Sequence, residues 1–383
     1  MANLFPDLQF TESELLLLQI LTSPRAEAIV CWDNWKSMFL PNERTSYEKR
    51  QMSRVFSLLR AYGVDIEELR PIEQFFTRNR KQIQTYVAAL DPVLEWLNSS
   101  KIPVMILKSG SFLALGQEEP GSRAMFDLDI LVPYESAEFV YEYLLTSGWS
   151  LRDNPMPTGD GKRFYHSVDL VNSNGGKIDL HWHVMYDSLN GNLDLSCWRR
   201  ARKAVLGQRE VFVLSPEDLF LLICVHGWQR YKFRYDWAPD IRVLLAADRE
   251  KLDWNYLLLL ARKRHLVEIF QKSIQFLFTE CQLELPVEFV KSVENLELSL
   301  PEKLTAFGRA KGSNTPLGGL PYRIATIMRM NPSGVWGFLS TSLIVIKKAW
   351  GIEGSSFYVV RKIIGRLWKV QIRFLKNFLR IKS

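Results

Sequence analysis

The chain of 383 residues is long enough for two or three domains. Hydrophobic residues make up 47% of it and charged residues 24%, which excludes a disordered chain, a collagen or a coiled coil as a description of the whole. No run of about 18 apolar residues predicts a membrane-spanning helix, and the N-terminus MANLFPDLQFTESE lacks the basic region and apolar core of a signal peptide. Since the four cysteines form no metal or redox spacing, we expect a cytoplasmic protein.

The first hundred residues predict a helical lead-in domain, residues 1–100. Thr11-Glu-Ser-Glu14 has the form of a capping box and precedes an apolar run. Two further segments without helix breakers, residues 46–62 and 72–97, carry apolar side chains at helical spacing.

The pattern changes at Pro103, and residues 101–214 predict an α+β core. Short β-rich runs, amphipathic segments and a pair of alternating runs joined by Asn-Ser-Asn-Gly-Gly follow one another. The expected elements are two strands (104–107 and 126–132), two helices (110–115 and 135–147) and a hairpin (164–171 with 177–184).

After the core, residues 215–311 predict a second helical domain. Ser215 suits an N-cap and Pro216 a first helical position. Residues 312–321 are rich in Gly, Pro, Asn and Ser and predict a linker, so residues 312–383 are expected to be a linker followed by basic amphipathic helices. The fold class is therefore α+β, with a small mixed-sheet core flanked by N- and C-terminal helical segments.

Three aspartates in the core suggest a metal site. Asp127 and Asp129 lie two apart on a predicted strand and so share one face, while the apolar residues between them point the other way. Asp179 lies in Ile178-Asp-Leu-His-Trp182 on a later strand. Oxygen ligands of this kind suit Mg²⁺ or Mn²⁺, and acids from neighbouring strands can hold two cations for phosphoryl or nucleotidyl transfer. The alternative is a solvated strand face.

Basic and small residues near these acids suggest a phosphate site. The turn Lys108-Ser-Gly-Ser111 could bind phosphate through backbone N–H groups, Lys108 and Ser111. Arg123 lies four residues before Asp127 and carries a guanidinium fork suited to a polyphosphate. The alternatives are a simple helix start at Gly110 and a surface charge at Arg123.

Together these motifs resemble the nucleotidyltransferase superfamily with the DNA polymerase beta-like fold. More narrowly, they are similar to poorly characterised bacterial nucleotidyltransferase-like proteins found near exopolysaccharide and lasso-peptide biosynthesis genes. The resemblance covers about residues 104–182. It implies that Asp127, Asp129 and Asp179 are catalytic and bind Mg²⁺ or Mn²⁺. It also implies that Lys108, Gly110, Ser111 and Arg123 bind a nucleoside triphosphate, with ATP expected as co-substrate.

The function we expect is a metal-dependent transfer of a nucleoside monophosphate to a hydroxyl of a small molecule, sugar or peptide, with release of pyrophosphate. Asp179 is the candidate general base. The alternative is a non-catalytic nucleotide- or peptide-binding adaptor of the same fold. A zinc site of Asp179, His181 and His183 is a further alternative, and we expect His166 near these histidines.

The C-terminal segment differs from the rest of the chain in charge. The net charge of the chain is +7, yet residues 303–383 carry 15 Lys or Arg and one acid, whereas the other 302 residues carry 34 basic and 41 acidic residues. Basic residues spaced three and four apart between Lys362 and Arg380 predict an amphipathic helix with a cationic face. We expect it either to pack on the body or to bind a partner. That partner would be an anionic membrane surface, which would make the protein peripheral, nucleic acid or a leader peptide.

Overall fold

The computed structural model describes residues 10–38, 45–153, 155–157, 159–227, 236–310 and 316–330. The chain divides into two compact units, Met1–Leu298 and Ser299–Ser383. Residues 1–9 lie outside the described residues, and so does the basic helix predicted between Lys362 and Arg380. Within the described ranges, no helix combines the length and the apolar character needed to cross a membrane.

Four helices open the first unit. They are α1 (Glu12–Thr22), α2 (Arg25–Ser37), α3 (Ser46–Ala61) and α4 (Ile66–Ser99). The predicted capping box at the start of α1 is present, because the Glu14 N–H donates to Thr11 Oγ1 at 3.1 Å and the Thr11 N–H donates to a Glu14 carboxylate oxygen at 3.3 Å. Leucines and aromatics of α1–α3 pack with the first turns of α4 into a separate small core.

A mixed sheet of seven strands follows, in the order β3-β4-β5-β2-β1-β7-β6. The strands are β1 (Met105–Ile106), β2 (Leu128–Leu131), β3 (Trp149–Leu151), β4 (Ser167–Asn172), β5 (Lys177–His181), β6 (Arg202–Leu206) and β7 (Arg209–Val213). The central strands β2 and β5 are parallel, whereas β4 and β5 form the predicted antiparallel hairpin. The predicted α+β fold with a mixed sheet is therefore confirmed.

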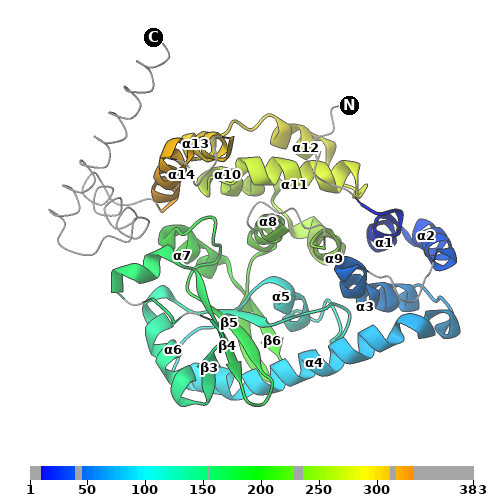
Figure 1. Ribbon diagram of the computed structural model, residues 1–383, viewed down its shortest axis with the longest axis horizontal. Helices are drawn as coiled ribbons and strands as arrows, with labels where there is room; N and C mark the ends of the chain where they lie inside the picture. The colour runs from blue at the N-terminus through cyan, green and yellow to red at the C-terminus, as the bar shows by residue number, and fades with distance from the viewer. Residues whose placement is uncertain are drawn as a thin grey trace, which may run out of the picture. The chain divides into compact units, whose positions relative to one another are not determined.

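The two faces of the sheet contact different helices. Leu128 and Ile130 of β2 pack in one core with the second half of α4 and with α6 (Ala137–Thr146). Figure 1 shows α4 running along this side of the sheet. Leu131 points to the opposite face and joins a core built mainly by α8 (Pro216–Gly227) and the helices after it. Since Asp129 lies two residues before Leu131, its side chain belongs to the α8 face.

The remaining helices are short. They are α5 (Lys108–Ala114), α7 (Gly191–Arg200), α9 (Ala238–Asp248), α10 (Trp254–Lys263), α11 (Val267–Thr279) and α12 (Val287–Glu294) in the first unit, and α13 (Leu300–Ala310) and α14 (Pro316–Arg329) in the second. Ser215 caps α8 as predicted, since its Oγ accepts the Asp218 N–H at 3.2 Å.

Three details differ from the sequence prediction. The expected linker at residues 312–321 is wrong in its second half, because α14 begins at Pro316; proline suits a first helical position, where no N–H partner is needed. The expected strand 164–171 begins only at Ser167, after a 3-10 helix, Gly159–Phe164. The hairpin of β6 and β7 was not anticipated, since its Lys, Arg and Glu side chains interrupt the apolar pattern.

Gly110 determines how closely α5 approaches the sheet. A Cβ atom at this position would lie 2.6 Å from Ile106 Cγ2 and 3.5 Å from Leu128 Cδ2. Both partners are fully buried strand residues, so neither can move away without disturbing the core.

We predict that Gly110→Ala lowers the free energy of unfolding by about 1–3 kcal/mol, the usual cost of overpacking a core. Chemical denaturation monitored by circular dichroism measures this. Gly191→Ala is the matched control, because a Cβ there meets nothing within 4 Å, and it should be neutral or slightly stabilising. Equal stability of the two variants would show that α5 has room for a Cβ.

Candidate active site

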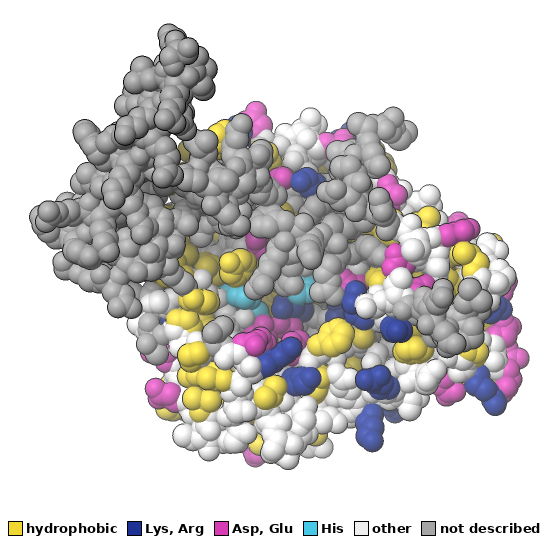
Figure 2. Space-filling view, viewed as in Figure 1, with side chains coloured by type: hydrophobic (Ala, Val, Ile, Leu, Met, Phe, Trp, Pro, Cys, Tyr) yellow, Lys and Arg dark blue, Asp and Glu magenta, His cyan; other side chains and the backbone are white. Residues whose placement is uncertain are grey.

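A row of carboxylates crosses three neighbouring strands on the α8 face of the sheet. Asp127 lies just before β2 and Asp129 within it. The register pairs Asp129 of β2 with Asp179 of β5, and Asp179 in turn with Asp169 of β4. Figure 2 shows acidic side chains gathered at the centre of this view, beside Lys, Arg and His side chains. The predicted convergence of Asp127, Asp129 and Asp179 is thus present, and Asp169 extends the row.

Two cationic side chains lie among these acids. Lys108 Nζ forms an ion pair with Asp129 Oδ1. His181 Nε2 lies 3.1 Å from the same oxygen and 2.9 Å from Asp179 Oδ2. Lys108 and His181 therefore reduce a repulsion that the carboxylates would otherwise experience in a buried row.

The pKa values of the acids diverge as a result. Burial and the neighbouring Asp129 raise the pKa of Asp127 to about 6. Burial also tends to raise the pKa values of Asp129 and Asp179, but nearby cations outweigh burial. Lys108 and His181 hold the pKa of Asp129 below its ordinary range. His181 is the main cause of the lowered pKa of Asp179. Burial lowers the pKa of His181, yet Asp179 and Asp129 outweigh burial and raise it to about 9.

Lys108 occupies an unusual backbone conformation. It begins α5 directly after β1, and its φ of 49° lies in the left-handed region that side chains other than glycine rarely adopt. Such strain persists only where the surroundings impose it, and it concentrates at functional positions. Here the conformation accompanies the Lys108–Asp129 ion pair.

Opposite the acids lies a group of arginines that we call the arginine wall: Arg50 and Arg54 of α3, and Arg123 of the loop before β2. Asp240 of α9 joins two of them, because its Oδ1 lies 2.6 Å from Arg54 Nη2 and its Oδ2 lies 2.7 Å from Arg123 Nη2. Arg54 also contacts Glu118 at 3.0 Å, and Arg123 donates to Ser109 Oγ. Nε and Nη1 of Arg54 are buried without a hydrogen-bond partner among the residues described.

The carboxylates and the arginine wall enclose one cavity of about 280 Å³, the first cavity. Its lining includes Lys108, Asp127, Asp129 and Asp179 together with the three arginines. A second cavity of about 580 Å³ shares Lys108 and His226 with the first. The second cavity is lined by aromatic, apolar and acidic side chains, among them Tyr165, His166, Asp169, His181, Tyr186 and Asp187.

The structure brings five of the seven predicted site residues together, but not Gly110 and Ser111. Gly110 packs against Ile106, and the buried Ser111 Oγ donates to the Ile106 carbonyl at 2.9 Å. Neither lines the first cavity, whereas Ser109 does. The Gly-Ser pair therefore packs α5 on the sheet, and the phosphate turn predicted for it is not formed at these two residues.

The histidine grouping also differs from the prediction. β5 ends at His181, and His183 lies beyond it with Nδ1 2.7 Å from Asp194 Oδ2. Asp179, His181 and His183 are therefore not aligned as the alternative zinc site would need, because the strand alternation stops at His181. His166 is near, as expected, with its ring centroid 5.1 Å from that of His181.

Several residues of the site are not predicted by the sequence patterns. Arg50 and Arg54 lie one turn apart on a helix, a spacing that a solvated face shows equally well. Asp240 lies 186 residues after Arg54, and no local pattern links the two. Asp169 carries a recognisable signal in the sequence, since it stands between Val168 and Leu170 as Asp179 stands between Ile178 and Leu180.

We predict that Asp240→Asn lowers the free energy of unfolding by about 3–5 kcal/mol, because it leaves Arg54 and Arg123 without their shared buried carboxylate. Thermal and urea denaturation measure this. Glu284→Gln removes one charge from the exposed ion pair with Arg249 and should cost about 0–1 kcal/mol. If both variants were equally stable, Asp240 would not hold the arginine wall.

Comparison with known proteins bears on this geometry. No curated protein matches the chain. Among solved structures, a crystal structure of an antigenic nucleotidyltransferase-like protein from Paracoccidioides brasiliensis is similar at 13% identity, covering 54% of this chain and 96% of that chain with a TM-score of 0.32. A family model described as uncharacterised nucleotidyltransferase matches residues 52–278, more than half of the chain and the whole carboxylate row. The chain belongs to this nucleotidyltransferase family.

Proposed function

We propose that the protein transfers a nucleoside monophosphate from a nucleoside triphosphate, with ATP as the expected donor, to a hydroxyl group of an acceptor. Divalent cations, Mg²⁺ or Mn²⁺, would be held by Asp127, Asp129 and Asp179. Lys108, Arg123 and Arg54 would contact the triphosphate. The family supports nucleotidyl transfer in general, and the contacts described above support the assignment of roles.

One observation carries the proposal: the first cavity has unsatisfied groups of opposite kinds on its two sides. Arg54 Nε and Nη1 are buried donors, and Asp179 Oδ1 is a buried acceptor, all without a hydrogen-bond partner among the described residues. Buried polar groups are rarely left unpaired. A triphosphate with its cations would satisfy both sides, since phosphate oxygens accept from guanidinium groups and cations bind carboxylate oxygens.

The carboxylates fit a divalent cation by this same test. Asp127, Asp129 and Asp179 offer oxygen atoms from adjacent strand positions, and one of these oxygens has no other partner within the described part of the chain. Cations held there by Asp127, Asp129 and Asp179 would supply positive charge against the negative charge that develops during transfer. The contribution of the chain itself is to keep the carboxylates in register and the arginines opposite them.

The second cavity suits the acceptor. It shares Lys108 and His226 with the first cavity, so a molecule in it would approach the nucleotide from the side of Asp169 and His181. In the reaction the acceptor oxygen forms a bond to the α-phosphorus. The bond from that phosphorus to the bridging oxygen of the β-phosphate breaks, and pyrophosphate leaves.

The acceptor proton needs a base on the side of the second cavity. Asp179, the candidate base, lines the first cavity, where the cations are proposed to bind. Asp169 lines the second cavity, and burial together with Asp179 raises its pKa. We therefore assign the proton to the carboxylate of Asp169 and leave Asp179 as a ligand.

We predict that Asp127→Asn weakens cation-dependent binding of a non-hydrolysable ATP analogue by about 10–150-fold, the equivalent of one charge-assisted contact of about 1.5–3 kcal/mol. The fold should survive, since removing one of several repelling carboxylates leaves no cation unpaired at Asp127. Titration calorimetry with and without Mg²⁺ measures this. Asp33→Asn, a change on the exposed face of α2, is the control. Unchanged Mg²⁺-dependent binding in Asp127→Asn would contradict the site.

We predict that Arg123→Ala lowers nucleotide affinity by a similar factor, about 10–150-fold, because its guanidinium fork contacts the triphosphate. Arg123→Lys should restore only part of the affinity, since an ammonium group cannot make the bidentate contact. Arg249→Ala removes a partly exposed arginine outside both cavities and serves as control. Equal affinity in Arg123→Ala and the control would exclude Arg123 from nucleotide binding.

A further inference from the structure

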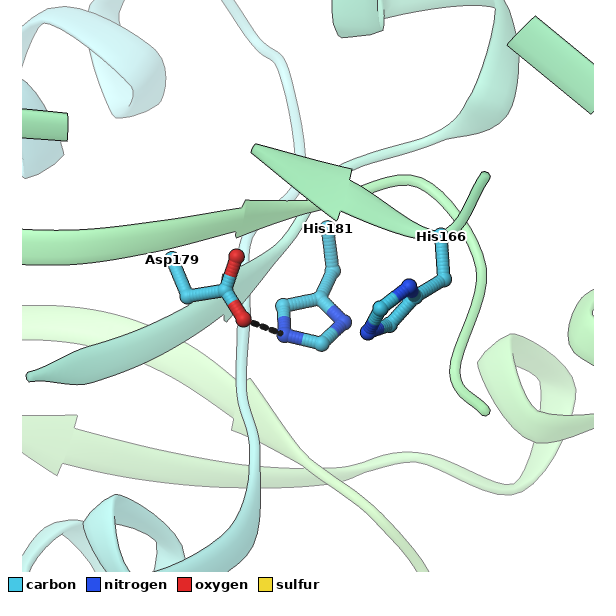
Figure 3. A group of neighbouring side chains, drawn as sticks. All are labelled: His166, Asp179 and His181. Atoms are coloured by element: carbon cyan, nitrogen blue, oxygen red, sulfur yellow. Dashed lines mark ion pairs between the residues drawn. The ribbon is translucent and has the colours of Figure 1, made fainter. Parts of the chain in front are cut away.

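His166, Asp179 and His181 converge at the border of the second cavity. One ligand atom from each of the three lies within 4.8 Å of the other two. Figure 3 shows the three side chains pointing toward one another, with Asp179 and His181 on β5 and His166 beside the start of β4. These side chains belong to the hairpin of β4 and β5 and its approach, which also carries Asp169.

We infer that His166, Asp179 and His181 bind a first-row transition-metal ion, of which Mn²⁺ and Zn²⁺ are representatives, on the acceptor side of the site. This inference deepens the proposed function, because it assigns a second kind of cation to the same carboxylate row. Asp179 lines the first cavity, whereas His166 and His181 line the second, so the three ligands meet where the two cavities adjoin.

The orientation of His181 supports a ligand role. Its Nδ1 faces the backbone carbonyl oxygen of His183 at 3.2 Å, while Nε2 faces the Asp179 carboxylate at 2.9 Å. Nε2 also lies 3.1 Å from Asp129 Oδ1, so an ion bound at Nε2 would take the place of the proton that the two carboxylates accept. The carbonyl oxygen of His183 would still accept from Nδ1 and fix the orientation of the ring. The His181 side chain is 1% exposed, so water does not compete for that nitrogen.

His166 and Asp179 supply the remaining ligands. The His166 ring contacts the rings of His181 and Tyr186 at their edges. Asp179 Oδ1 is buried and has no hydrogen-bond partner in the described ranges. Metal bonds of about 2.0–2.2 Å bring ligands to roughly 3.5 Å from one another, and rotation of the side chains about their χ angles covers the difference.

The donor set selects the class of ion. Two imidazoles and one carboxylate suit Zn²⁺, Mn²⁺ and Fe²⁺, whereas Mg²⁺ strongly prefers oxygen ligands. Asp127 and Asp129 offer oxygen alone. The two ends of the carboxylate row therefore differ in kind, with an oxygen end facing the first cavity and a nitrogen-containing end facing the second.

The test is Mn²⁺ binding to the full chain without nucleotide, followed by electron paramagnetic resonance and by calorimetry. We expect nitrogen couplings from coordinated imidazole in the pulsed spectra, and a 100-fold excess of Mg²⁺ should not displace the ion. His166→Gln and His181→Gln should each weaken Mn²⁺ binding by more than about 10–100-fold, the cost of losing even an outer-shell partner. His265→Asn is the control, since asparagine tolerates the left-handed backbone found at that histidine outside the cavities.

The outcomes separate this inference from the proposed function. Mn²⁺ that binds without nitrogen couplings, and equally well to both glutamine variants, would overturn the histidine site while leaving the oxygen site of Asp127 and Asp129 intact. Nitrogen couplings that persist in Asp127→Asn would support it even if nucleotide binding were lost. If His181→Gln does not fold, as judged by circular dichroism, His166→Gln decides, because its ring lies at the wall of the second cavity.

Discussion

Electrostatic repulsion within one row of the sheet is the constraint on which the rest of the site depends. Strands about 4.8 Å apart bring Asp129, Asp179 and Asp169 side by side on a largely buried face. Lys108 and His181 offset this repulsion, and both contact Asp129 Oδ1. The strained backbone of Lys108 and the close approach of α5 at Gly110 place one of these two cations, and the end of β5 places the other.

The acids could be predicted from the sequence because their geometry is local. A single residue, Leu128, separates Asp127 from Asp129, and apolar neighbours mark the other face, so period-two alternation alone aligns them. The pairing of Asp129 with Asp179 is not local, but each acid interrupts a β-rich run in the same way. The main helices and strands could be predicted for the same reason, since a capping box or an alternating run spans only a few consecutive residues.

Other parts of the site could not be predicted because one sequence pattern serves two structures. A Gly-Ser pair after a strand suits a phosphate turn and equally a tightly packed helix start, and only the contact with Ile106 decides between them. A histidine two residues after another aligns with it only while the strand continues, and β5 ends at His181. The arginine wall depends on a contact between Arg54 and Asp240, which are 186 residues apart in the sequence, and no local sequence pattern predicts such a contact.

The sharing of Asp240 by Arg54 and Arg123 has a thermodynamic consequence. Arg54 belongs to the N-terminal helical core, and Arg123 and Asp240 belong to segments next to the sheet and to α8. An anion that bridges the two arginines adds its binding free energy, RT ln(1 + [L]/Kd), to the association of these parts. A bound anion would therefore stabilise the contact between α3 and the loop before β2, and with it the packing of the N-terminal helices on the rest of the unit. The stability of the N-terminal helices would thus depend on whether the site holds an anion, although these helices lie away from the reacting atoms.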